Sequence, residues 1–453
     1  MTTKQFAATR FERTSYDVFF IGQNIVFMIL TSFLSVYYTN ALGIPATIVA
    51  GILLAARIWD AFADPLLATF IERSKLKGGK FKPWVKLASI TVPLFTVLCF
   101  GFESFLIDQS LAVRIAYAIV TYIAWGTLYA ASDAPAYALS TVMTPYPEER
   151  NLLLSFNKIT GLIGVLAAMV MFPLLLSSTD NNWFISVLIF SVIAFLTMFL
   201  IRFTKERVTH EGTKSPAISE IFKAVTSNKY LVAIVVISII ANGTNFATTL
   251  TPFVAGDIYG DPNATASMLA IGILPMLLVA PLAPMLIRKF GKIKLVQLSF
   301  AATVVFSLLS YWFARDNVTW FLVITFLKGL LSSPFLIIYS LFFSDCIEYD
   351  DYTNGRRFEA ITFAAQTFMA KISTAISGGL SMWIIGIAGY AAAVSGQTVT
   401  QSPTALNALW ATLNIGPAIG GAIAMAIMYK AYDLTEDRVK AMVEANMKKA
   451  VKQ

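Results

Sequence analysis

Seven ionisable residues lie inside segments that are otherwise long and apolar. They are Arg57, Asp60, Asp64, Asp133, Lys158, Lys328 and Lys371. An ionisable side chain at the centre of a bilayer costs at least about 2.5 kcal/mol to insert, so each is a functional candidate. Asp60 and Asp64 are four residues apart and share one helix face. Two carboxylates on one face favour a shared proton or cation. The pair therefore predicts a cation-coupling site for H⁺ or Na⁺, with Na⁺ as the metal ion to consider.

A structural role for these charges stays open. Arg57 precedes Asp60 by one turn and can pair with it. For Asp133 the favoured interpretation is a contact with substrate, whereas Lys158 and Lys371 fit either a substrate contact or a counter-ion. Lys328 lies in the outer third of its segment and could extend to the membrane interface.

Membrane-spanning helices are the elements expected to position these charges. The 453-residue chain is 57% hydrophobic and 13% charged, with a mean hydropathy of +0.70, whereas soluble domains carry about 25% charged residues. Roughly 20 apolar residues span a bilayer as a helix. The sequence predicts an all-α, multi-pass protein with twelve transmembrane helices over 16–38, 46–71, 84–102, 113–143, 155–176, 183–202, 230–253, 268–287, 295–313, 320–344, 361–388 and 405–428.

Several classes of protein are excluded by the same residues. Cys99 and Cys346 lie in separate apolar segments and predict no disulfide framework. The single histidine, His210, leaves no cluster for zinc, haem or iron–sulfur ligation and no triad. We therefore expect neither an enzyme nor a cofactor. The positive net charge is expected to reflect membrane topology, so the predicted partner is the lipid bilayer and not nucleic acid. The protein is expected to function as a monomer.

The distribution of Lys and Arg predicts the topology. Most of the 34 basic residues lie in alternate connections, so the positive-inside rule places both termini in the cytoplasm. Basic loops at 72–83 and 288–294 join the second helix to the third and the eighth to the ninth. This repeat predicts two six-helix bundles of the major facilitator fold, at 1–202 and 230–431, with a middle loop at 203–229 and a cytoplasmic tail at 432–453. Such repeats place the substrate near the membrane midplane.

Short motifs in the chain are more specific than the repeat. They are Arg57-Ile-Trp-Asp-Ala-x-x-Asp-Pro65, Gly79-Lys-Phe-Lys-Pro-Trp84, Asp133-x-Pro135, Asp345-x-x-Glu-Tyr349 and Gln366-Thr-Phe-x-x-Lys371. In this order they resemble the glycoside–pentoside–hexuronide:cation symporter family, from about Tyr16 to Tyr390. The resemblance implies import of a small sugar with a monovalent cation across the inner (cytoplasmic) membrane by alternating access.

The resemblance also implies roles for residues at matching positions. Asp60 and Asp64 match the cation-site aspartates, Lys371 a lysine near that site, and Thr367 could add an oxygen. The expected substrate-binding residues are Asn24, Arg57, Tyr129, Asp133, Tyr137, Lys158 and Gln366. Tyr137 stands where the family has a tryptophan that stacks on the sugar, and a tyrosine ring can supply the same apolar face. The expected cytoplasmic gate consists of Arg73 and Lys80 with Asp345 and Glu348.

Departures from the family pattern bear on the ion and the sugar. Ala63 and Ala130 stand where the pattern has an Asn and a Thr that help bind sodium. Sodium needs several hard oxygens and a proton needs one carboxylate, so H⁺ is favoured, although Thr367 keeps Na⁺ open. Asn24 replaces a sugar-binding acid, and an acidic hexuronide would be less repelled there. A neutral glycoside or pentoside stays the alternative.

Two other functions remain as alternatives. An exporter or lipid-like carrier of amphipathic molecules would use the same fold, but its cavity should be apolar, and Asn24, Tyr129 and Gln366 argue against that. A non-transporting sensor or scaffold would carry an added soluble domain, whereas the tail after Tyr432 is short and charged. A sugar symporter is therefore the leading hypothesis.

Overall fold

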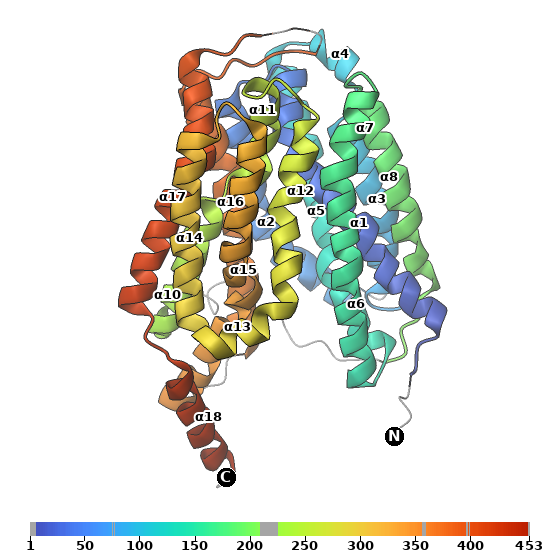
Figure 1. The fold of residues 1–453 in the computed structure, drawn as a ribbon. Helices are drawn as coiled ribbons and strands as arrows, with labels where there is room; N and C mark the ends of the chain where they lie inside the picture. Colours follow the sequence, from blue (N-terminus) through green and yellow to red (C-terminus); the bar gives the residue numbers. More distant parts are fainter. Residues whose placement is uncertain are drawn as a thin grey trace. The chain divides into compact units, whose positions relative to one another are not determined.

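The computed structural model describes residues 6–74, 76, 78–208, 225–355, 359–395, 397 and 399–451. Side chains are described throughout these ranges except at 61, 62, 64, 65, 68, 69, 72, 73, 359, 360 and 447–451. Within them all regular structure is helical (Figure 1), and Leu42 and Val394 form an isolated antiparallel bridge. The chain divides into two compact units, Met1–Ser215 with Tyr390–Gln401, and Pro216–Gly389 with Ser402–Gln453.

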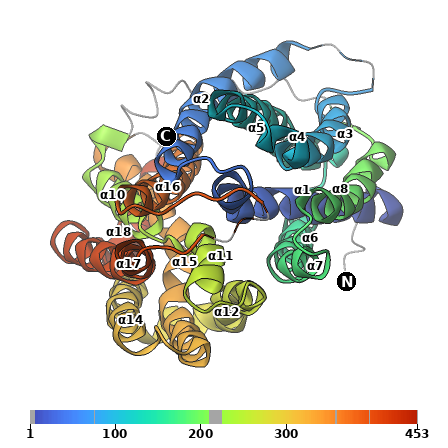
Figure 2. The same cartoon turned by 90° about the horizontal axis from the view of Figure 1, so that it is seen from above.

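The first unit is a bundle of six long helical segments. They are α1 (Arg10–Val36) continued by η1 (Tyr37–Ala41), α2 (Ala46–Arg73), α3 (Lys82–Cys99), α5 (Leu111–Met143), α6 (Pro147–Leu166) continued by η2 (Ala167–Met171) and α7 (Phe172–Ser178), and α8 (Trp183–Phe199) with the 3₁₀ turn η3 (Leu200–Phe203). A short helix, α4 (Glu103–Ile107), joins α3 to α5. α1 packs against α6 and α8, α3 against α5 and α8, and α2 against α5 (Figure 2).

The second unit repeats this packing. Its helices are α10 (Lys229–Gly243), α11 (Ala247–Asp257), α12 (Ala264–Val279), η4 (Ala280–Leu282), α13 (Ala283–Phe290), α14 (Lys292–Phe313), α15 (Val318–Asn354), α16 (Glu359–Ile387), α17 (Pro403–Ala431) and the tail helix α18 (Glu436–Val451). α10 packs against α16 and α17, α14 against α15 and α17, and α12 against α15. Counting α10–α11 and α12–α13 as single bent segments, each pair corresponds to a pair in the first unit.

Local sequence explains where several helices begin and end. Thr9 and Glu12 form a capping box at α1, in which the Glu12 amide donates to Thr9 Oγ1 at 3.2 Å and the Thr9 amide donates to Glu12 Oε2 at 2.7 Å. The Asn228 side chain accepts from two amides in the first turn of α10. Gly355, at φ +63°, ends α15 in the left-handed conformation that glycine adopts without steric cost.

The helices agree with the predicted spans in position and differ at their ends. Within the described ranges, ten helical segments are long and apolar enough to cross a membrane, and α2 and α3 lie at predicted spans but outside these ten. The span predicted at 230–253 is broken after Gly243, between α10 and α11. α15 continues ten residues past the predicted end at 344, because hydropathy marks the limit of the apolar segment and not that of the helix.

The connection between α16 and α17 belongs to the first unit by its contacts. The Ala393 and Ser395 amides donate to the Thr39 and Ala41 carbonyls, each at 3.0 Å. Asn40 Nδ2 donates a hydrogen bond to the Tyr390 hydroxyl at 3.2 Å. The bridge between Leu42 and Val394 thus lies where this connection covers the end of η1.

Candidate binding site

Asp133 of α5 and Gln23 of α1 form the polar centre of the first unit. Gln23 Nε2 donates to Asp133 Oδ1 at 3.0 Å. Gln23 is buried at 1% exposure, whereas Asp133 is half-buried. A half-buried carboxylate held by an amide has acceptor capacity left for another donor. This pair is therefore suited to bind a hydroxyl group.

Aromatic rings continue the same face of α5 on both sides of Asp133. Tyr129, Asp133 and Tyr137 are spaced by four residues and so follow one helix face. Tyr129 stacks on Phe27 of α1 with ring centroids 5.2 Å apart and an interplanar angle of 28°. Tyr137 contacts Phe20 at 5.2 Å and keeps 47% of its surface exposed. An exposed ring beside a carboxylate can contact both the C–H face and the hydroxyls of a sugar.

Asn24 of α1 lies where this helix meets α6, the helix that carries Lys158. The Asn24 side chain donates to the Phe20 carbonyl at 2.9 Å and lies over Gly161 of α6, where a β-carbon would be 3.0 Å from Asn24 Nδ2. Lys158 is exposed on α6, three residues before Gly161. Glycine at 161 therefore permits α6 to approach the Asn24 amide.

A second group of predicted site residues lies where α2 packs against α5. Arg57 Nη1 pairs with Asp60 Oδ2 at 3.1 Å on α2. A β-carbon on Gly126 of α5 would lie 3.0 Å from Asp60 Oδ1. Trp59 Nε1 donates to Thr127 Oγ1 at 2.9 Å. Arg57, predicted as a substrate contact, thus neutralises a predicted cation ligand, and the Asp64 side chain lies outside the described residues.

The remaining candidates of the predicted substrate and cation sites belong to the second unit. Gln366 Nε2 on α16 donates to Ser340 Oγ of α15 at 3.0 Å, and Gln366 Oε1 is buried with no hydrogen-bond partner among the described residues. Thr367 Oγ1 donates to the Phe363 carbonyl at 3.2 Å. Lys371, one turn further along α16, is half-buried, as is Lys328 on α15.

The predicted gate residues make contacts within their own units. Asp345 of α15 forms a buried ion pair with Lys292 at the start of α14. Glu348 accepts a hydrogen bond of 3.2 Å from Asn446 of the tail helix α18. Lys80 uses its backbone amide to bond Glu206 at 2.8 Å. The Arg73 side chain lies outside the described residues.

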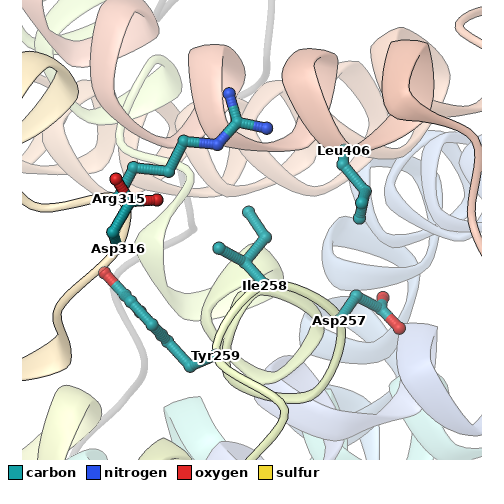
Figure 3. Close-up of a pocket in the computed structure, with 6 residues that line it drawn as sticks. All are labelled: Asp257, Ile258, Tyr259, Arg315, Asp316 and Leu406. Atoms are coloured by element: carbon teal, nitrogen blue, oxygen red, sulfur yellow. The ribbon is translucent and has the colours of Figure 1, made fainter.

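A pocket of about 320 Å³ lies elsewhere in the second unit (Figure 3). Its lining contains none of the predicted site residues and consists of Asp257, Ile258, Tyr259, Arg315, Asp316 and Leu406. Tyr259 donates to the Ala314 carbonyl at 2.8 Å. Burial, with a smaller contribution from the Asp316 carboxylate, raises the pKa of the Tyr259 phenol above its ordinary value, so this group is a neutral donor at pH 7.

The acidic residues Asp60 and Asp64 are predicted to offer Na⁺ a site. Among the described side chains, no group of three or more His, Cys, Asp or Glu residues is arranged to hold a metal ion. The described side chains include that of Asp60 but not that of Asp64. The Asp60/Asp64 cation site therefore stays a prediction.

Sequence reasoning missed Gln23, Gly126 and Gly161. Gln23 directly precedes Asn24, so two amides in succession on an apolar helix were the available signal. The two glycines act through the close approach of another helix, and a lone glycine in a helix does not identify its neighbour.

Comparison with known proteins identifies the family of the chain. The family model described as MFS/sugar transport protein matches residues 15–436. The chain is 28% identical to the isoprimeverose transporter of Lactiplantibacillus pentosus, over 96% of this chain and 91% of the relative. It is 24% identical to the glucuronide carrier protein homolog of Escherichia coli (strain K12), over 96% and 95%.

Among solved structures, that of the nucleoside transporter NupG resembles this fold. Its TM-score is 0.66 at 12% sequence identity, with 92% of this chain and 99% of the other covered. At such low identity the likeness shows the fold alone. The family match and the named relatives carry more: the chain is a multi-pass transporter of the inner membrane that belongs to the MFS/sugar transport proteins, within the glycoside–pentoside–hexuronide:cation symporter family.

Proposed function

We propose that this transporter imports a glycoside, pentoside or hexuronide together with a cation, with H⁺ favoured over Na⁺, by alternating access. Twelve transmembrane helices, both termini in the cytoplasm and the boundaries 1–202, 203–229, 230–431 and 432–453 belong to the same proposal. The observation that carries it is the position of α5. This helix contacts Asp60 at Gly126 and holds Asp133 against Gln23 two turns later.

Sugar binding is assigned to the face of α5 that meets α1. The Asp133 carboxylate would accept hydrogen bonds from sugar hydroxyls, and the exposed Tyr137 ring would contact the apolar side of the sugar. Lys158 and Asn24 complete the polar set in the first unit, with Tyr129 packed beside it. Asn24 carries no charge, which leaves room for an acidic sugar, and the cationic Lys158 could offset the charge of such a sugar.

Cation coupling is assigned to Asp60 and Asp64 on α2, with contributions from Lys371 and Thr367. Ala130 follows Gly126 by four residues and so continues the α5 face that meets α2. Neither Ala63 nor Ala130 offers a side-chain oxygen. Thr127, one turn before Ala130, already donates to the Ile123 carbonyl at 2.9 Å and accepts from Trp59. This scarcity of neutral oxygens supports the preference for H⁺.

Counterflow into proteoliposomes tests the substrate class directly. Purified protein is loaded with an unlabelled sugar and offered trace labelled sugars, both neutral glycosides and pentosides and acidic hexuronides. We expect at least one class to be exchanged by the wild-type protein and by Asp60→Ala. No exchange of any sugar, combined with efflux of an amphipathic dye, would favour an exporter instead.

A further inference from the structure

The Glu206 carboxylate binds the loop that joins α2 to α3. Glu206 follows the last helical turn of the first unit's bundle and accepts from three successive backbone amides. Glu206 Oε2 accepts from Lys80 at 2.8 Å, and Oε1 accepts from Phe81 at 2.8 Å and from Lys82 at 2.7 Å. The amides at the start of a helix lack partners within that helix and attract negative charge. Glu206 thus caps α3 from 124 residues away.

The second unit contains a related contact, made to one backbone amide instead of three. Glu436 follows α17, the last helix of that unit's bundle, and its Oε1 accepts from the Lys292 amide at the first residue of α14. α14 corresponds to α3 in the repeat of helix packing. Each loop also has a glycine at positive φ against the carboxylate, Gly79 at +127° and Gly291 at +74°. The two units therefore share the place of the carboxylate in the helix repeat and the glycine beside it.

Neighbouring contacts fix the segment that carries Glu206. The Arg207 guanidinium pairs with Glu12 at 2.6 Å near the start of α1. The Arg207 and Val208 amides both donate to the Val142 carbonyl at the end of α5, at 2.7 and 3.0 Å. Residues 206–208 therefore tie the α2–α3 loop to helices α1 and α5.

α2 depends on this loop for its link to α3. α2 packs mainly against α5. At its C-terminal end, Ser74 Oγ accepts from Trp84 Nε1 of α3 at 3.0 Å, and Phe70 contacts the Trp84 ring at 5.4 Å. The start of α3, capped by Glu206, thus holds the end of the helix that carries Asp60.

We propose that Glu206 and Glu436 are positioning residues of the transport cycle. Each carboxylate fastens the basic loop of its own unit to the segment that follows the unit's last helix, so that the second and third helices move with the rest of the bundle. In the first unit this keeps α2, and with it the cation-coupling carboxylates, aligned on α5. The transport role rests on the proposed function, whereas the capping contact does not.

Hydrogen exchange and counterflow together test this proposal. In purified Glu206→Ala we expect amides 80–82 to exchange about tenfold faster than in wild type, with faster exchange also along 66–74 of α2. The maximal counterflow rate should fall at least about threefold while the half-saturating sugar concentration stays within about twofold, because the sugar contacts are untouched. Glu206→Gln should lie between, since one amide oxygen replaces two carboxylate oxygens.

Matched glycine variants separate the carboxylate contact from backbone strain. A β-carbon on Gly79 would be 2.4 Å from the Glu206 carboxylate carbon, whereas one on Gly78, at φ +110°, would have nothing within 4 Å. Gly79→Ala should therefore reproduce Glu206→Ala, and Gly78→Ala should not. Exposed Glu148 on α6 supplies a charge control as Glu148→Gln.

Three outcomes would overturn the proposal. Unchanged exchange at 80–82 in Glu206→Ala would mean that the cap does not form. Faster amide exchange at an unchanged counterflow rate would mean that Glu206 has only a structural role. Equal effects of Gly78→Ala and Gly79→Ala would mean that backbone strain in the loop, and not the contact with the carboxylate, causes the loss of transport. Exchange is measured without sugar, so a failed cap is seen even in protein that moves no sugar. Failure of the proposed function is seen separately, as wild-type protein without counterflow.

Discussion

Gly126 of α5 and Asp60 of α2 approach so closely that a β-carbon on Gly126 would lie 3.0 Å from Asp60 Oδ1. This is tighter than an ordinary β-carbon contact, so a methyl group at 126 would require the Asp60 carboxylate to shift by a few tenths of an ångström. Glycine in the middle of a helix costs roughly 0.5–1 kcal/mol relative to alanine. Its presence here is explained by the space that the Asp60 carboxylate requires.

Gly126→Ala should therefore impair coupling although alanine favours the helix. We expect sugar counterflow to persist and gradient-driven accumulation to fall several-fold, because the displaced Asp60 no longer pairs with Arg57 in its present geometry. Gly51→Ala on α2 is the control, since a β-carbon there would meet nothing within 4 Å. Normal accumulation in Gly126→Ala would show that Asp60 can shift without loss.

Loss of either member of the Gln23–Asp133 pair should weaken sugar binding. Removing a hydrogen bond to a charged group costs about 1.5–3 kcal/mol, or about tenfold or more in affinity. Asp133→Ala should have the larger effect because it removes the carboxylate that we propose contacts the sugar, and Gln23→Ala should act by releasing that carboxylate. Equilibrium binding of labelled sugar measures both, with Gln109→Ala in the α4–α5 connection as control. Unchanged affinity in both variants, in correctly inserted protein, would make the pair structural.

The fold was easier to predict from the sequence than the site. Apolar segments locate helices because each span must bury its backbone polar groups within itself, and the spacing of Tyr129, Asp133 and Tyr137 follows from helix geometry. Hydropathy does not report the break after Gly243 or the extension of α15. The cap on α3 was not predictable, because Glu206 binds backbone amides, which every residue possesses, and leaves no pairing signal in the side chains.

Asn or Thr oxygens introduced beside the carboxylates should change the response to sodium. The double variant Ala63→Asn with Ala130→Thr adds two neutral oxygens, and hard cations prefer oxygen ligands of both kinds. We expect stimulation of uptake by sodium to rise in this variant. In the wild type, addition of sugar to unbuffered, de-energised cells should alkalinise the medium. Strong sodium stimulation of the wild type without alkalinisation would contradict the preference for H⁺ and point to Thr367 as an oxygen donor.

Lys158 should matter most for acidic sugars. Lys158→Ala removes the exposed cation on α6, which we propose donates hydrogen bonds to sugar hydroxyls, so the affinity for every sugar should fall. The affinity for a hexuronide should fall by a larger factor than the affinity for a neutral glycoside, because the variant also loses the positive charge. Lys158→Arg, which keeps the charge, is the matched control. Competition binding with the two kinds of sugar measures the ratio, and equal losses for both would remove Lys158 as a determinant of charge preference.

The most direct test of cation-coupled sugar transport is accumulation against a gradient in proteoliposomes. With an inward proton gradient, wild-type protein should concentrate its sugar above the outside level, and collapse of the gradient should return it to equilibrium. In proteoliposomes with Asp60→Ala or Asp64→Ala, the internal sugar concentration should reach the outside level but not exceed it, because the driving ion has lost its site. Both variants should still exchange sugar in counterflow. Accumulation by both variants equal to that of wild type would contradict the assignment of coupling to these carboxylates.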